Sequence, residues 1–462
     1  MYGPMRMRAA IAMVSAAAAA VFGTVPAAAR SADTPPETYS YLVLTRPDGA
    51  AGAALAEAAV RRAGGTVVQA YGRIGVVVAH GGPGFAAAVR GRPGVARVGA
   101  TRTVPVRAAE RTGAPAADPA EAAQWNLAMV HAYEAQRITE GVPDVVVAVA
   151  DTGVDDRHPD LAPNFDAALS ADCSTGRPIQ ADAAWRAPRS DHGTHVAGTI
   201  AAARNGTGVV GVAPGVRIAA LRIGDADAMF HGEASVCGFV WLAEHADRGL
   251  RIANHSYYND PWWLLCPDDE DQAVIHEAVR RAAAYAADRG VLSIAAAGNA
   301  DYDLAHKTVD PYSPDDAAER PVRPRPVTDA CRMLPAELPG VVTVAAVGAD
   351  GRRAGYSNTG LGVVDLAGPG GGGAGGEGVL STAREGGWAH KAGTSMAAPA
   401  VSGVAALIAS AHPAWGPAAI TARLYATATR LPCAAPCTAS GDIDSFHGHG
   451  LVDALHAVRP GK

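Results

Sequence analysis

The chain lacks a block of positive charge. It carries 39 lysine and arginine residues against 45 aspartate and glutamate residues, which gives a formal net charge of −6 at pH 7. Proteins that bind nucleic acids cluster basic side chains against the phosphates, so we expect no nucleic-acid partner. Beyond residue 29 we also expect no segment that is long and apolar enough to span a membrane, and we expect no membrane partner.

Cysteine is scarce as well, with 6 residues in a chain of 462, all of them beyond residue 170. The even number favours disulfide bonds, and none of the six stands where a nucleophile would be expected. Six cysteines allow many pairings, and the sequence does not decide between them. The proline-rich segment 301–332 is expected to be an inserted surface loop. A bond Cys433–Cys437 would close a small local loop, a bond Cys266–Cys331 would fasten the segment 301–332, and Cys173 with Cys237 would then remain.

The segment Met1–Ala29 has the features of a secretory signal. Arg6 and Arg8 give the positive start, Ala9–Val25 is an alanine-rich apolar stretch, and Ala27–Ala29 offers a cleavage site between small residues. The alternative is a short membrane anchor, but the stretch is short for a spanning helix and ends in proline and small residues. We therefore expect a secreted, extracellular protein whose cysteines form disulfides in an oxidising environment.

The length predicts more than one folded unit. Tyr39–Val106 alternates strand-like and helix-like segments and predicts a small α/β domain. Residues 107–123 are rich in alanine, proline and charge without periodicity, as in an exposed linker that a protease cuts. In residues 124–458, apolar runs of strand length alternate with helix-like segments. This alternation predicts an α/β fold of three layers, α/β/α, with a mostly parallel central sheet.

The expected strands of this sheet are Val145–Ala150, Arg217–Ile223, Arg251–Ser256, Val291–Ala297, Val341–Val347 and Val363–Leu366. The expected helices are His192–Ala203, Ala234–Asp247, Asp271–Asp288 and Ala397–Ala411. Ligands of such sheets bind beyond the carboxyl ends of the strands. Asp151, Ser256 and Asn299 stand at three of these ends, so we expect their side chains at one edge of the sheet.

Three short motifs carry the residue types of acyl transfer. Gly393–Pro399 places Ser395 just before an apolar helix, where free N–H groups and the helix dipole favour a developing negative charge. Upstream, His192 opens a helix of small residues and Asp151 ends an apolar strand. A serine nucleophile needs a base, and the base needs an orienting carboxylate. Taken alone, the serine motif also fits an ordinary helix cap.

The motifs that carry these residues, in chain order, are Asp151–Gly153, Asp191–Gly198 and Gly393–Pro399. Together they resemble the subtilisin-like serine proteases, the subtilases or peptidase family S8. The resemblance covers residues 124–458 and implies the subtilisin-like fold. It also implies a serine endopeptidase in which Ser395 is the nucleophile, His192 is the general base and Asp151 orients the histidine.

Further site residues follow from the same resemblance. It makes Asn299, at the end of Ala296–Asn299, the side-chain donor to the oxyanion. His195 is a poorer candidate for the base because the family's motif places the base first, and Asp191 is expected to cap the helix. Tyr39–Val106 resembles the inhibitor-like prodomain of secreted members, which implies an autoprocessed precursor with its own intramolecular inhibitor. A separate substrate-binding domain is the alternative.

The segment Ala253–Ser256 resembles the family segment that lines the substrate cleft. The family usually continues with Leu-Gly-Gly, whereas this chain has Tyr257-Tyr258-Asn259, so the depth of the primary specificity pocket is open. An extended peptide would add a strand between the cleft edges. Such backbone pairing suits many sequences and predicts broad protein or peptide substrates. The expected substrate-binding residues are Ser256, Tyr257, Tyr258, Ala297 and Gly298.

In many relatives two loops jointly bind a calcium ion, and here those loops are His158–Leu161 and Ala203–Val209. Calcium takes six to eight oxygen ligands from carboxylates, amides and backbone carbonyls. An Asn-Gly turn without metal is the alternative. The ligands that the resemblance implies are side-chain oxygens of Asp160 and Asn205, carbonyls of Ala203, Thr207 and Val209, and a further oxygen from Gln124.

Two other functions compete with the protease. A catalytically silent relative would bind peptides without cutting them, but such a relative need not retain Asp151, His192, Asn299 and Ser395 together. An esterase of the α/β-hydrolase type would need Gly-x-Ser-x-Gly followed by the acid and the histidine. In this chain the serine comes last, so the esterase fits poorly.

Overall fold

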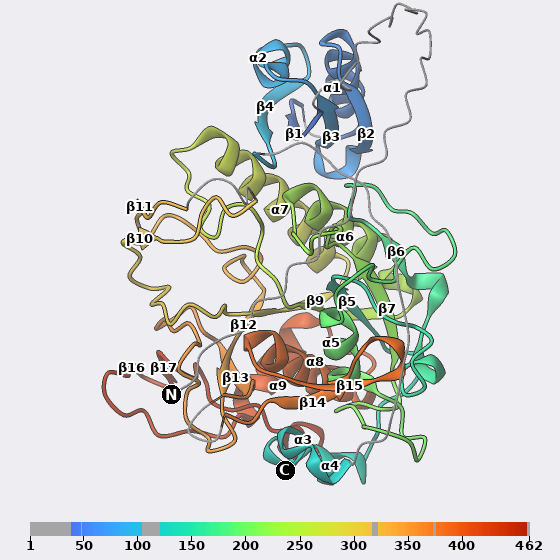
Figure 1. Cartoon of the computed structure of the whole chain (residues 1–462), viewed down its shortest axis with the longest axis vertical. Coiled ribbons are helices and arrows are strands. Elements are labelled where there is room, and N and C mark those ends of the chain that lie inside the picture. Colours follow the sequence, from blue (N-terminus) through green and yellow to red (C-terminus); the bar gives the residue numbers. More distant parts are fainter. Residues whose placement is uncertain (1–37, 48, 104–120, 317–321, 373–375, 460–462) are drawn as a thin grey trace, which may run out of the picture. The chain divides into compact units, whose positions relative to one another are not determined.

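The large domain is built on a sheet of seven strands. The computed structural model describes residues 38–47, 49–103, 121–316, 322–372 and 376–459, so the expected signal and most of the linker lie outside the described residues. The strand order is β13-β12-β9-β8-β5-β7-β6, and all neighbouring pairs are parallel (Figure 1). The strands are β5 (Val146–Asp151), β6 (Ala171–Asp172), β7 (Arg217–Arg222), β8 (Leu250–His255), β9 (Leu292–Ala296), β12 (Val342–Val347) and β13 (Leu366–Pro369).

Helices cover both faces of this sheet. They are α5 (His192–Ala201), α6 (Gly232–Glu244), α7 (Glu270–Asp288) and α8 (Thr394–Ala411). Successive residues of a strand face opposite sides. Val147 and Val149 of β5 belong to one buried cluster with α5 and α8, whereas Val146 and Ala148 belong to another with α6 and α7. The predicted three-layer α/β/α fold is therefore confirmed.

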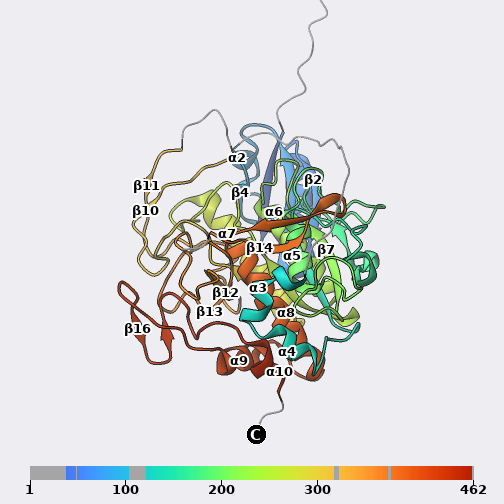
Figure 2. The ribbon, with the colours of Figure 1, turned by 60° about the horizontal axis from the view of Figure 1, so that its bottom comes forward.

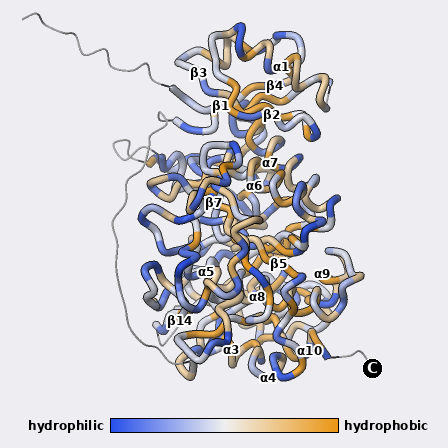
Figure 3. The backbone as a smooth tube through the Cα atoms, turned by 90° about the vertical axis from the view of Figure 1, so that its right-hand side faces the viewer, coloured by the Kyte–Doolittle hydropathy of each residue, from blue (hydrophilic) through white to orange (hydrophobic). Residues whose placement is uncertain are grey.

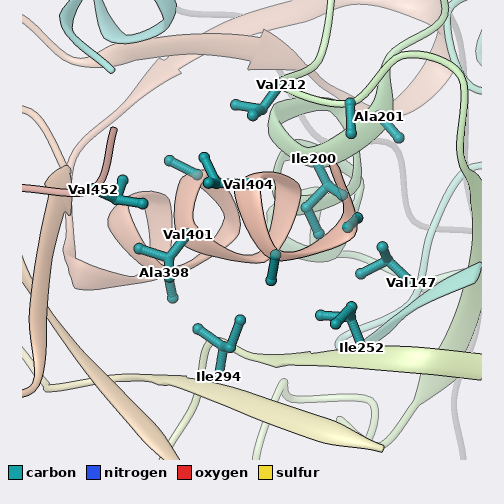
Figure 4. Close-up of a cluster of buried hydrophobic side chains, with 14 of the residues drawn as sticks. Val147, Ile200, Ala201, Val212, Ile252, Ile294, Ala398, Val401, Val404 and Val452 are labelled. Carbon is teal, nitrogen blue, oxygen red and sulfur yellow. The ribbon is translucent and has the colours of Figure 1, made fainter. Parts of the chain in front are cut away.

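Helix α8 runs through the core of the domain. Among the described residues it alone is long and apolar enough to cross a membrane, with 18 residues and a mean hydropathy of 1.5, but 83% of it is buried. Our expectation that no segment beyond the signal meets these criteria was wrong. In Figure 4, Val401 and Val404 of this helix lie among Ile200, Ile252 and Ile294. In Figure 3, which colours the chain by hydropathy, α8 and β5 are drawn largely in the hydrophobic colours.

Two element boundaries differ from the prediction. Helix α8 begins at Thr394 rather than Ala397, so Ser395 lies inside its first turn. Strand β13 covers Leu366–Pro369 rather than Val363–Leu366. The glycine at its centre, Gly368, reads as a turn residue, but a Cβ there would come within 2.5 Å of the carbonyl oxygen of Ala397. The close packing of the strand against α8 explains this glycine.

The remaining elements of the large domain are short. Helix α10 lies beside both α4 and α8 (Figure 2), and the backbone N–H of Ala454 in α10 donates a hydrogen bond to the carbonyl oxygen of Val130, which lies between α3 and α4. The prediction missed α9. These elements are α3 (Trp125–Met129), α4 (Ala132–Gln136), β10 (Val309–Asp310), β11 (Arg325–Pro326), β14 (Val379–Thr382), β15 (Trp388–Lys391), α9 (Pro417–Thr427), β16 (Ala439–Ser440), β17 (Ile443–Asp444) and α10 (Ala454–Val458).

The described residues before the linker form an antiparallel sheet of order β2-β3-β1-β4, as expected for a small α/β unit. Its elements are β1 (Tyr39–Thr45), α1 (Ala50–Arg62), β2 (Thr66–Tyr71), β3 (Val76–Gly81), α2 (Phe85–Val89) and β4 (Val95–Ala100). Tyr41 and Val43 of β1 pack with α1 and α2 in a core of their own. Leu42 and Leu44 instead join the buried cluster of α6 and α7. The second face of the small sheet is thus buried against the large domain.

The segment 301–332 is not a free surface loop. It contains the strand pair β10–β11, and Arg325 donates from Nη2 to Asp310 Oδ2 over 2.8 Å and from Nη1 to Gln272 over 3.2 Å. A disulfide also fastens it beside the segment that follows β8. The three disulfides of the described chain are Cys173–Cys237, Cys266–Cys331 and Cys433–Cys437.

Candidate active site

Asp151 and His192 meet at the carboxyl edge of the sheet. Asp151 is fully buried at the end of β5, and its Oδ1 lies 2.8 Å from His192 Nδ1, which donates to it. The backbone N–H of Thr152 donates to the same oxygen over 2.7 Å. Burial lowers the pKa of His192, but the charge of Asp151 and its hydrogen bond outweigh this effect and leave the pKa above its ordinary value. The pair can therefore hold a proton on the imidazole.

The residues before the histidine differ in part from expectation. Asp191 occupies the N-cap position of α5, but its side chain makes no capping hydrogen bond. It forms an ion pair with Lys391 Nζ at 2.7 Å instead. Ser190 Oγ accepts the backbone N–H of His192 over 3.1 Å. Asp191 therefore occupies the predicted cap position, but its side chain makes no capping bond and a neighbouring serine supplies the acceptor.

His195 lies one turn further along α5 and is fully buried. Its Nε2 is 3.0 Å from the carbonyl oxygens of Val379 and Ala389 and donates to them. Burial lowers its pKa to about 3. A neutral histidine that ties α5 to the β14–β15 pair is not exposed to a substrate. His195 is thus buried away from the cavity, whereas His192 forms part of its wall.

Ser395 is held from both sides by Ser256. Ser256 Oγ donates to the carbonyl oxygen of Ser395 over 3.0 Å, and Ser395 Oγ lies 3.3 Å from the carbonyl oxygen of Ser256. That carbonyl of Ser395 would normally accept the N–H of the residue four positions later in the helix. This residue is Pro399, which has no N–H. The proline therefore leaves a carbonyl to which the cleft serine binds.

The side chain of Asn299 is oriented by the helix start. Its Oδ1 accepts both the backbone N–H and the hydroxyl of Thr394, each over 2.8 Å. The N–H of Gly298 in turn donates to the Thr394 hydroxyl over 3.1 Å. Because Oδ1 is occupied, Nδ2 is the end of the amide that is available to a substrate. Asn299 also lines the cavity that contains Ser395.

Asn358 braces the turn that carries Asn299. It is fully buried, and its Nδ2 donates to the carbonyl oxygen of Ala297 over 2.8 Å. Its Oδ1 accepts the N–H groups of Ala300 and Tyr302 over 2.9 and 3.1 Å. One buried amide thus fixes the backbone on both sides of Asn299. Asn358 was not predicted as a site residue, because no local sequence pattern marks it.

A cavity of about 490 Å³ joins these residues. Its wall includes His192, Ser395 and Asn299 together with the expected substrate residues Ser256, Tyr257, Tyr258 and Gly298. Ala297, also expected there, does not line the cavity and is fully buried beneath it. The lining residues that sequence reasoning did not select include Asp260, Trp263, Tyr312, Asp315 and Met333. Two of these come from the segment 301–332, whose composition indicated only a surface loop.

The loops expected to bind calcium do not present a free set of oxygens. Asp160 is fully buried, and its Oδ2 accepts the N–H of Val209 and the indole Nε1–H of Trp388, each over 2.9 Å. Its Oδ1 lies 3.3 Å from Asn205 Nδ2, whose own Oδ1 accepts the N–H of Thr207. Gln124 is likewise bound to both backbone groups of Val210. N–H donors therefore occupy the carboxylate where a cation would have to sit, and the residues do not fit calcium as arranged.

The carbonyls of Ala203, Thr207 and Val209 border the same loops, and the N–H of Ala203 donates to the carbonyl oxygen of Asp160 over 2.7 Å. The sequence could not reveal the misfit, because Trp388 lies in β15, more than 200 positions from Asp160.

Comparison with known proteins agrees with this geometry. Residues 143–450 match the model of the subtilase family. The chain is 32% identical to subtilisin E of Bacillus subtilis over 316 residues, which is 68% of this chain and 66% of that protein, just under two thirds of its length. It is 30% identical to subtilisin BL of Lederbergia lenta over 340 residues, which covers 74% of this chain and all of that protein.

A solved structure shows the same fold. The epidermin leader peptide processing serine protease of Staphylococcus aureus superposes with a TM-score of 0.69 at 22% identity. The superposition covers 92% of this chain and 100% of that one.

Proposed function

Because the chain belongs to the subtilase family of peptidases, we propose that it is a serine endopeptidase that hydrolyses peptide bonds in proteins. One observation carries this proposal. His192, held by buried Asp151 at 2.8 Å, faces the same cavity as Ser395 and Asn299. Acyl transfer needs a nucleophile, a base with its orienting carboxylate, and a donor for the oxyanion within one site.

In the proposed reaction the hydroxyl oxygen of Ser395 attacks the carbonyl carbon of the scissile bond, and His192 Nε2 takes the hydroxyl proton. Asp151 keeps the imidazole in the tautomer with its proton on Nδ1 and stabilises the imidazolium. The oxyanion receives hydrogen bonds from Asn299 Nδ2 and the backbone N–H of Ser395. His192 then gives its proton to the leaving amine. Water, deprotonated by the same nitrogen, hydrolyses the acyl-enzyme ester.

The orientation of Asn299 supports its role as oxyanion donor. Thr394 fixes Oδ1 with two hydrogen bonds of 2.8 Å, so that no rotation of the amide is needed when negative charge develops. A donor that is already oriented costs no reorganisation in the transition state. The cavity segments Ser256–Tyr258 and Ala296–Ala300 would face the substrate from opposite sides.

Residues 39–106 would act as a prodomain that inhibits the enzyme until it is cut. Besides the apolar contact of β1, Arg97 pairs with Glu270 at 2.8 Å, and the N–H of Ala100 donates to Asp271 Oδ1 over 2.9 Å. Arg102 and Glu233 form an ion pair at 2.6 Å with both side chains nearly inaccessible. Residues 107–123 would contain the maturation cut, and Met1–Ala29 would direct secretion. Calcium is left out of this proposal because the donors around Asp160 do not fit it.

The test is labelling with a fluorophosphonate, which reacts with activated serines. The mature protein should be labelled at Ser395 and should hydrolyse casein, and Ser395→Ala should lose both properties. Ser410→Ala is the matched control, because this serine lies in the same helix but does not line the cavity. Its Oγ donates to the carbonyl oxygen of Ala406 over 2.7 Å and accepts the N–H of Val142 over 3.2 Å. A protein that binds peptides but takes up no label would instead be a silent relative of the family.

A further inference from the structure

Two carboxyl groups form part of the wall of the active-site cavity. Asp260 follows β8 and Asp315 belongs to the segment 301–332. Both line the cavity that contains Ser395 and His192. Asp260 is 4% exposed, and Asp315 is half-buried. The carboxylates thus stand inside the space that a substrate would enter.

The two groups lack a positive partner within the described part of the chain. The backbone N–H of Phe230 donates to Asp260 Oδ2, and the hydroxyl of Tyr258 donates to Asp315 Oδ2 over 2.7 Å. The side chains of Asp260 and Asp315 hydrogen-bond to each other, and no lysine, arginine or histidine among the described residues forms an ion pair with either carboxylate. Buried carboxyl groups in such a pair must share a proton or pair with a cation that a ligand supplies.

Burial, followed by the neighbouring Asp315, raises the pKa of Asp260 well above its ordinary value, and burial also raises the pKa of Asp315. Two carboxyl groups this close do not both ionise in an empty cavity. A cation between them would remove the repulsion and let both carry charge. Both carboxyl groups can therefore be ionised together only when a positive ligand occupies the cavity.

The other walls suit the stem of a long basic side chain. Tyr258, Trp263 and Tyr312 line the cavity, and the rings of Trp263 and Tyr312 meet edge to face with centroids 5.1 Å apart. Aromatic faces pack against methylene groups and attract lysine or arginine cations. An acidic substrate side chain would be repelled here. An apolar one would bury the carboxyl groups without satisfying them.

We propose that this cavity binds a cationic side chain of the substrate, arginine or lysine, within the four residues before the scissile bond, and that Asp260 and Asp315 determine this specificity. The proposal rests on the proposed peptidase function and replaces the broad specificity expected from the sequence with a narrower substrate class. The carboxylate of Asp260 also has a structural use, since it accepts the N–H of Phe230. An asparagine retains that acceptor, so Asp260→Asn removes the charge alone.

The experiment compares peptide substrates on mature enzyme whose active sites have been titrated with a fluorophosphonate. The peptides differ at one position at a time and carry arginine, lysine, norleucine or glutamate. At one position, arginine or lysine should raise kcat/KM over norleucine by about 100-fold, as expected for charge-assisted hydrogen bonds. Asp315→Asn and Asp260→Asn should each reduce this preference, the ratio of kcat/KM for the arginine peptide to kcat/KM for the norleucine peptide, by about 10-fold or more.

Asp316→Asn is the matched control. Its carboxylate is adjacent in sequence but does not line the cavity, and it accepts hydrogen bonds from Thr103. This variant should keep the full preference. If titrated wild-type enzyme cuts arginine and norleucine peptides equally well, or if both aspartate variants retain the preference, the inference is refuted while the peptidase function stands. If no active sites are titrated and no peptide is cut, the proposed function itself fails.

Discussion

Calcium and a chelator should leave the melting temperature of this protein unchanged, because Trp388 and its neighbours already satisfy Asp160. The carboxylate is fully buried and accepts two N–H groups at 2.9 Å on one oxygen. A buried carboxylate must be paired or hydrogen-bonded. The indole N–H of Trp388 supplies one of these bonds. In the calcium site that the sequence suggested, the metal ion would bind this carboxylate instead.

The informative change is Trp388→Phe, which removes the indole N–H and keeps an aromatic ring. A hydrogen bond to a charged group contributes about 1.5–3 kcal/mol. In a domain of this size 1 kcal/mol corresponds to roughly 2 °C, so the midpoint should fall by about 3–6 °C. Added calcium should not restore it, because the remaining N–H of Val209 still points at the same oxygen.

The measurement is calorimetric unfolding of the Ser395→Ala protein, in which self-digestion cannot interfere, in excess calcium and in excess chelator. Trp415→Phe serves as the control, because this tryptophan is also partly buried and stacks on His412 with ring centroids 3.8 Å apart. A ligand present at 1,000 times its Kd adds about 4 kcal/mol to stability. A calcium-dependent rise of several degrees that Asp160→Ala abolishes would therefore refute the reasoning and restore the metal site.

Three further results are expected. Asn299→Ala should lower kcat roughly 100-fold or more with little change in KM. Asn358→Ala should lower kcat less, because Asn358 acts through the backbone of the turn. An unchanged kcat of Asn299→Ala in peptide assays would show that another group holds the oxyanion. Catalysis needs neutral His192, and because Asp151 raises the pKa of His192, the acid limb of a kcat/KM profile should have its midpoint above the ordinary 6.5 and shift downward in Asp151→Asn. Arg102→Ala in the isolated segment 39–106, added to the mature enzyme, should weaken inhibition by about 100-fold or more, since it leaves Glu233 buried and unpaired; an unchanged inhibition constant would contradict this role.

Local patterns were sufficient to predict five of the seven strands of the sheet, whereas β13 was placed too early in the chain and β6 was missed. The fully buried run of β5, like the other central strands, is apolar without alternation because both of its faces meet helices. Asp151 was expected at the end of such a run, and His192 at the start of a helix of small residues. The start of α8 could not be predicted in the same way, because Thr394 is held there by Asn299, which is 95 residues away.

The proposed specificity residues could not be predicted from the sequence, for a related reason. Asp260 and Asp315 are 55 residues apart and meet only because the disulfide Cys266–Cys331 and the anchoring of Arg325 fold the segment 301–332 back beside the cleft. Composition described this segment correctly as polar and rich in proline, but its position depends on tertiary contacts. The contact between Trp388 and Asp160 is a second feature that could not be predicted. No sequence motif marks an indole that donates to a carboxylate in place of a cation.

The maturation reaction joins the two proposals. The end of the small domain is tied beside the cavity, where Arg102 pairs with Glu233 and the N–H of Thr103 donates to Asp316 over 2.6 Å. The sequence that follows carries Arg107 and Arg111. A cavity that binds basic side chains would find Arg107 and Arg111 at high effective concentration, because both are on its own chain. Cleavage after one of these arginines would produce an enzyme that begins at Ala108 or Thr112.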